Sequence, residues 1–82
     1  MEVKVLGPGC PNCKRLYDEI EKALRQLSLA VKPVKVEAID EIVALGAMST
    51  PALVINGEVK SAGRIPSQRE LTSWLATAAI QQ

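Results

Sequence analysis

Apolar and polar residues alternate over short stretches of the chain, and this period of two predicts β-strands. In the first stretch, Val3 and Val5 face one side of the strand and Leu6 the other. Asn56-Gly57 separates two such stretches and is a strong hairpin signal, because both turn positions favour positive φ. The pattern predicts four strands, at residues 2–6, 33–37, 52–55 and 58–61.

Other stretches carry apolar residues at helical spacing. The longest runs from about Pro11 to Ser28, and its apolar face consists of Leu16, Ile20, Ala23, Leu24 and Leu27. Asp40 is the predicted N-cap of a short helix over residues 41–45, and Gly46 suits its C-terminal end. Ser67 and Glu70 have the spacing of a capping box, which opens a last helix with the apolar residues Leu71, Trp74, Leu75 and Ala78.

The predicted order of elements is β-α-β-α-β-β-α. A strand, a long helix and a second strand form a βαβ unit, whose two strands should be parallel with a right-handed connection. The last two strands should run antiparallel to each other through their hairpin. With 82 residues, the chain is expected to be a single α/β domain spanning residues 1–82, in which helices pack on an open mixed sheet.

Composition and charge exclude several classes of function. The net charge of +1 and the two aromatic residues provide neither the basic stripe nor the stacking surface that nucleic-acid binding needs. The absence of histidine removes Ser-His-Asp triads and His-containing zinc sites. The sequence contains neither a membrane span nor a secretory signal, which favours the cytoplasm.

The only two cysteines lie in Cys10-Pro11-Asn12-Cys13, where a predicted strand gives way to a helix. Pro11 suits the first helical position, which makes Cys10 the candidate N-cap. The Cys10 sulfur would then accept hydrogen bonds from the backbone N–H groups of Asn12 and Cys13. A helix N-terminus contributes about 0.3 to 2 kcal/mol toward a negative charge, and 2 kcal/mol lowers the pKa of a thiol from about 8.5 to about 7. Cys10 is therefore the predicted nucleophile and Cys13 the resolving thiol.

Three other interpretations of the two cysteines remain open. They could form a purely structural disulfide, although so short a loop stabilises a protein by only about 2 kcal/mol. They could bind a soft metal such as Cu(I) or Zn, with a second copy completing a zinc shell. They could also be two inert thiols in a non-catalytic scaffold.

Two segments resemble a known family. Gly9-Cys10-Pro11-Asn12-Cys13-Lys14 after the first strand, and Ser49-Thr50-Pro51 leading into Ala52–Gly57, are similar to the corresponding segments of a minimal thioredoxin fold. The closing helix completes the likeness, which covers roughly residues 2 to 80. More narrowly, the chain resembles the small archaeal and bacterial thioredoxin-like proteins often labelled redox-active disulfide protein 2.

The resemblance implies a fold, an activity and a site. The fold would be a four-stranded mixed sheet flanked by helices, and the activity that of a thiol–disulfide oxidoreductase acting on protein disulfides, recharged by an upstream reductase. By analogy, Cys10 attacks, Cys13 resolves, Pro51 is a cis-proline facing the Cys10 sulfur, and the backbone of Thr50 pairs with the substrate. The protein is expected to be a monomer with no cofactor besides its Cys10–Cys13 disulfide.

One position departs from the family pattern. Thioredoxin has a buried acid six residues before its first cysteine, and the corresponding residue of this chain is Lys4. If Lys4 pointed toward the cysteines, its charge would stabilise a thiolate, whereas a strand lysine otherwise reaches solvent. Lys35 is a weaker candidate for the same role, and Pro11 and Asn12, inside the motif, are further candidates for modulating the pKa of the thiols.

Overall fold

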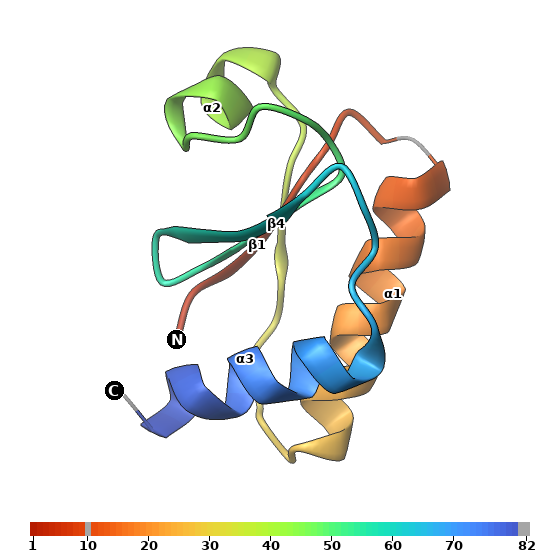
Figure 1. The fold of residues 1–82 in the computed structure, drawn as a ribbon, viewed down its shortest axis with the longest axis vertical. Coiled ribbons are helices and arrows are strands. Elements are labelled where there is room, and N and C mark those ends of the chain that lie inside the picture. The colour runs from red at the N-terminus through yellow and green to blue at the C-terminus, as the bar shows by residue number, and fades with distance from the viewer. Residues whose placement is uncertain (10, 81–82) are drawn as a thin grey trace.

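The computed structural model describes residues 1–9 and 11–80, and its seven elements follow the predicted order (Figure 1). They are β1 (Val3–Leu6), α1 (Pro11–Gln26), β2 (Val34–Val36), α2 (Ile39–Ala44), β3 (Ala52–Ile55), β4 (Glu58–Ala62) and α3 (Gln68–Ile80). Each strand lies within about one residue of its predicted bounds, because the alternation that predicts a strand also determines which residues the sheet buries.

The four strands form one mixed sheet in the order β2-β1-β3-β4. β1 and β2 are parallel, and Val5 pairs with Lys35. β3 runs antiparallel to both β1 and β4, with Leu6 opposite Ala52. The predicted βαβ unit and terminal hairpin are therefore confirmed, and the end of β1 lies beside the start of β3.

The two faces of the sheet are covered by different helices. Val3 and Val5 of β1 and Leu53 and Ile55 of β3 pack against α1 and α3 in the larger core. On the opposite face, a smaller core gathers around α2 and consists of Leu6, Val36, Ile42, Ala47, Ala52 and Val54. Figure 1 shows α2 apart from α1 and α3. Because successive residues of a strand point to opposite faces, β1 and β3 each contribute to both cores.

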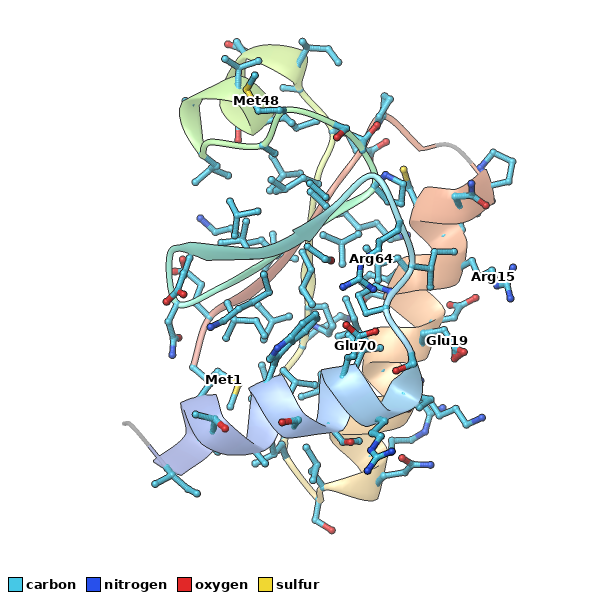
Figure 2. All side chains as sticks on the ribbon, viewed as in Figure 1. Met1, Arg15, Glu19, Met48, Arg64 and Glu70 are labelled. Carbon is cyan, nitrogen blue, oxygen red and sulfur yellow. The ribbon has the colours of Figure 1, made fainter. Side chains whose placement is uncertain are left out.

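Helix α1 begins at Pro11, as predicted, and ends at Gln26, two residues before the expected end. Its buried residues, Cys13, Leu16, Ile20, Ala23 and Leu24, lie on the single face that the sequence indicated. Ser28 follows in the left-handed region with φ of 56°. Figure 2 shows Arg15 projecting from α1 away from the sheet, on the polar side of the helix.

The prediction that Asp40 caps the short helix is wrong. α2 begins at Ile39, and its N-cap is Ala38, which makes no side-chain capping hydrogen bond. The amide of Ile42 donates to the carbonyl oxygen of Ala38 at 3.0 Å, so the first helical turn closes around Asp40. Asp40 and Glu41 lie in that turn, where a negative charge still interacts favourably with the helix dipole.

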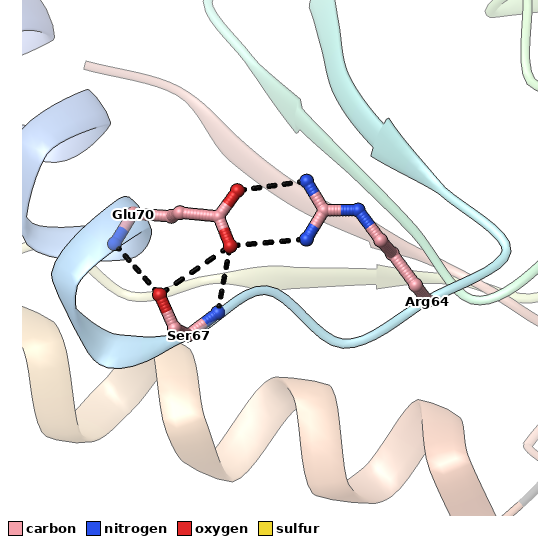
Figure 3. A network of polar contacts seen from close by, with 3 residues as sticks. All are labelled: Arg64, Ser67 and Glu70. Carbon is pink, nitrogen blue, oxygen red and sulfur yellow. Dashed lines mark hydrogen bonds and ion pairs between the residues drawn. The ribbon is translucent and has the colours of Figure 1, made fainter.

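The capping box at the start of α3 is confirmed (Figure 3). The Glu70 amide donates to the Ser67 hydroxyl oxygen at 3.2 Å, and the Ser67 amide donates to the Glu70 carboxylate at 3.1 Å. The two terminal guanidinium nitrogens of Arg64, Nη1 and Nη2, also donate to this carboxylate, at 3.0 and 2.8 Å. The hydrogen bonds from Arg64 and from the Ser67 backbone lower the pKa of Glu70 to about 2.

Within residues 1–9 and 11–80, none of the helices has both the length and the apolar character needed to cross a membrane.

Candidate active site

Cys13 is the third residue of α1, and only 6% of its surface is exposed. Pro11 and Asn12, which precede it in the first turn, are both exposed. Cys10, the predicted nucleophile, lies outside the described residues. The described part of the motif therefore consists of a buried sulfur at the start of a helix, preceded by two solvent-facing residues.

Gly7, directly after β1, is the residue against which the Cys13 side chain packs. A Cβ atom built on Gly7 would overlap the Sγ atom of Cys13 and lie 3.1 Å from its Cβ. The Gly7 amide donates to the carbonyl oxygen of Val36 at 2.9 Å, which extends the pairing of β1 with β2 by one residue. Gly7 thus lets the buried sulfur approach the end of the sheet, a role that the sequence analysis did not identify.

The segment before β3 reaches the same end of the sheet. The Thr50–Pro51 peptide bond is cis. Pro51 is buried and Thr50 exposed. The Cβ atom of Thr50 lies 3.9 Å from the Cβ position built on Gly7, and the Gly63 amide donates to the Pro51 carbonyl oxygen at 2.9 Å. The fold therefore brings Thr50 to Gly7 and Cys13, although Thr50 is far from these two residues in the sequence.

A pocket of about 300 Å³ opens beside Cys13. It lies between the start of α1 and the ends of β1 and β2, and it contains two lysines and one glutamate. We call it the Cys13 pocket; it is lined by Val5, Gly7, Gly9, Cys13, Lys14, Lys35 and Glu37. An open pocket next to a buried sulfur gives solvent or a small reagent a route to that sulfur.

Lys4, the candidate for adjusting thiol ionisation, is not among the residues that line the Cys13 pocket. It alternates with Val3 and Val5, which face α1, so it lies on the opposite face of the sheet, the face of Leu6. Its ammonium group is 3.3 Å from a carboxylate oxygen of Glu2. Lys4 is thus a strand lysine with a surface partner.

Lys35, the weaker candidate, and Glu37, which the sequence analysis did not single out, both line the Cys13 pocket. The Lys35 ammonium lies 4.7 Å from the centroid of the Tyr17 ring, so it extends toward α1. A Glu37 carboxylate oxygen lies 3.2 Å from the Cβ position built on Gly9. The alternation of residues 33–37 placed Lys35 and Glu37 on one face, but only the pairing of β2 with β1 shows that this face borders Cys13.

Metal ligands are sparse in the described residues. Among them, no group of three or more histidine, cysteine, aspartate or glutamate side chains could hold a metal ion. The chemistry that this part of the chain presents is that of the Cys13 sulfur and the charged groups around its pocket.

A comparison with protein families agrees with this geometry. A family model described as a thioredoxin domain matches residues 1–76. The chain belongs to the thioredoxin family. Among curated thioredoxins, that of Methanothermobacter thermautotrophicus is 30% identical over 76 residues, covering 93% of this chain and 99% of the relative. That of Methanocaldococcus jannaschii is 32% identical over 73 residues, covering 89% and 84% of the two chains.

Membership of the thioredoxin family confirms the α/β fold expected from the sequence. It also makes the chain a thiol–disulfide oxidoreductase.

Proposed function

We propose that this protein reduces disulfides of other proteins through a dithiol formed by Cys10 and Cys13. The observation that carries the proposal is the position of Cys13, a buried sulfur in the first turn of α1 that packs on Gly7 and borders an open pocket. Cys10 directly precedes Pro11, the first residue of α1, in the sequence. A spacing of three at a helix start suits a pair of thiols that form and break one disulfide.

The reaction has two exchange steps. The Cys10 thiolate attacks one sulfur of the substrate disulfide, a mixed disulfide forms, and the first substrate thiolate leaves and takes a proton. Cys13 then loses its proton and attacks the Cys10 sulfur, which forms the Cys10–Cys13 disulfide and releases the second substrate thiolate. Two electrons pass to the substrate, and a reductase of dithiol character must return them.

Thr50 and Pro51 are the proposed substrate-binding residues. Thr50 is exposed and lies beside Gly7, and Pro51 directly precedes β3. An extended substrate segment running past Thr50 would lie at the end of the sheet where Cys13 is found. Backbone pairing of this kind recognises a strand-like segment with little dependence on its side chains.

Substrate trapping tests the proposal. The wild-type protein should reduce insulin disulfides in the presence of dithiothreitol, and Cys10→Ser should lower the rate to that of dithiothreitol alone. Cys13→Ser should instead accumulate a mixed disulfide between Cys10 and insulin, visible by non-reducing electrophoresis. Ser73→Ala, on the exposed side of α3, is the control and should keep the wild-type rate. If Cys10→Ser reduced insulin as fast as the wild type, the proposal would be wrong.

A further inference from the structure

We infer that Glu37 sets the redox equilibrium of the dithiol, because its carboxylate opposes ionisation of Cys13 and so makes the reduced protein a stronger reductant. The inference deepens the proposed function and rests on it. Glu37 acts through its charge on Cys13 and does not itself take part in the exchange of disulfides.

Glu37 lies at the pocket that borders Cys13. Glu37 follows Val36, whose carbonyl oxygen accepts the hydrogen bond of the Gly7 amide at 2.9 Å. Gly7 is the residue against which Cys13 packs. The Glu37 carboxylate itself lies over Gly9, 3.2 Å from the Cβ position built there, and it lines the Cys13 pocket. The carboxylate and the Cys13 side chain thus line the same pocket.

Two lysines act in the opposite direction. Lys14 reaches the Cys13 pocket from α1 and Lys35 from β2, and both are positively charged at neutral pH. The pocket that borders Cys13 is therefore lined by one negative and two positive side chains. Removing the charge of Glu37 leaves the two lysines unopposed, whereas removing that of Lys35 leaves a balanced pair.

The direction of the effect follows from the charges of the two redox states. The disulfide is neutral, whereas reduction by two electrons produces thiols that release protons to become thiolates. A neighbouring carboxylate raises the free energy of a thiolate and leaves that of the disulfide nearly unchanged. Ionised Glu37 therefore favours the disulfide, and the dithiol gives up its electrons more readily. The effect should grow with pH, as a larger share of the reduced protein carries thiolate.

The rate of alkylation of Cys13 tests whether the charge of Glu37 opposes ionisation of this thiol. In a Cys10→Ser background, neutral iodoacetamide should modify Cys13 three- to tenfold faster at pH 7.5 when Glu37→Gln is added. Glu41→Gln makes the same chemical change at an exposed position of α2 outside the pocket and should change the rate by less than 1.5-fold. Lys35→Gln should slow alkylation, and Glu37→Asp, which keeps the charge, should leave the rate close to that of Cys10→Ser alone. One molar salt should reduce these differences.

The reduction potential tests the consequence. Equilibration with a thiol couple of known potential should show Glu37→Gln to be a weaker reductant, with an equilibrium constant changed three- to tenfold, or about 14 to 30 mV. The difference from wild type should be larger at pH 9 than at pH 7. Far-ultraviolet circular dichroism of each variant confirms that the fold is retained.

Failure of this inference and failure of the proposed function give different results. If the wild type shows a reversible dithiol couple but Glu37→Gln and Glu41→Gln match it in potential and alkylation rate, the role of Glu37 is wrong and the proposed function stands. If the wild type shows no reversible couple, the proposed function is wrong, and the proposed effect of Glu37 on the reduction potential is wrong as well. The alkylation series still decides whether Glu37 controls Cys13 ionisation.

Discussion

At the scale of single residues, Gly7 matters most for the position of Cys13. The backbone of Gly7 is not in the left-handed region, since the glycines with positive φ are Gly9, Gly46, Gly57 and Gly63. Its requirement for glycine is therefore steric, and the atoms involved belong to Cys13. A side chain at position 7 would push the sulfur away from the end of the sheet.

Gly7→Ala is expected to destabilise the protein by about 1 to 3 kcal/mol, the usual cost of forcing an extra carbon into a packed site. Urea unfolding followed by tryptophan fluorescence measures the change. In a Cys13→Ala background, the same substitution should cost less than half as much, because the overlapping sulfur is gone. An equal cost in both backgrounds would show that the penalty arises elsewhere.

The sequence predicted the start of the helix that carries Cys13 because that signal is local. Cys13 lies in the first turn of a helix that begins at Pro11, and both features follow from four consecutive residues. Glu37 was missed because its place at the Cys13 pocket depends on the pairing of β1 with β2, which joins segments about 30 residues apart. Gly7 was missed because its contact with Cys13 depends on how the end of β1 packs against the start of α1. Lys4 lies on the face of β1 opposite Val3 and Val5, and its spacing from a cysteine does not determine that face.

At the scale of elements, the start of α3 carries the clearest polar network in the described residues. Glu70 accepts hydrogen bonds from Arg64 and from the backbone of Ser67, and these interactions favour its charged form. Ser67 closes the network by capping the first turn. The loop from β4 is therefore attached to α3 by side chains that depend on the ionisation of one carboxylate.

The stability of the protein should fall as the pH decreases from about 5 to 2, in part through Glu70. Its pKa is about 2 in the folded protein against an ordinary value of 4.5, so its contribution is complete above pH 4.5 and is lost between these two values. Glu70→Gln should flatten the pH dependence of the urea midpoint in this window. High salt should weaken the effect in the wild type, because the pair is exposed to solvent.

Ser67→Ala isolates the capping contribution, since it keeps the Arg64–Glu70 pair. We expect a loss of about 1 kcal/mol, typical of a removed N-cap hydroxyl. Thermal unfolding monitored by circular dichroism gives the measurement, and Ser73→Ala in the middle of α3 is the control. A loss no larger than that of the control would mean that the Ser67 hydroxyl does not stabilise the helix.

The comparison of Ser67 with Asp40 shows how far capping patterns predict helix starts. Ser67 is followed three residues later by Glu70, and the reciprocal bonds fix the start of α3. Asp40 lacks such a partner, since Val43 occupies that position. The burial of Ile42 against the sheet instead starts α2 at Ile39. Tertiary packing therefore decides the bounds of a six-residue helix, whereas local bonds suffice for the longer one.

At the scale of the whole molecule, the larger core joins α1, α3 and one face of the sheet. Leu75 is fully buried in this core and anchors α3. An 82-residue chain buries a smaller fraction of its surface than a larger protein does, so its total stability is limited. Replacing a single anchoring residue should therefore remove a large share of the total free energy of unfolding.

Leu75→Ala should destabilise the protein by about 2 to 5 kcal/mol, through lost burial and the cavity that remains. Ile80→Ala, on the same helix, removes a side chain that is 84% exposed and should cost less than about 0.5 kcal/mol. Urea unfolding provides the comparison, provided that the free energy of unfolding depends on urea concentration with the same slope in all three proteins. Similar costs for the two substitutions would contradict the assignment of Leu75 to the core.

The order of the strands has a consequence for contacts between copies of the protein. β2 and β4 are the outer strands, and an outer strand has unpaired backbone groups that another chain can join. β2 is only three residues long, and β4 carries Glu58 and Lys60, whose charged groups lie 3.3 Å apart. Short length and charge both discourage a neighbouring strand from docking, so neither outer strand is a good template for adding a further strand.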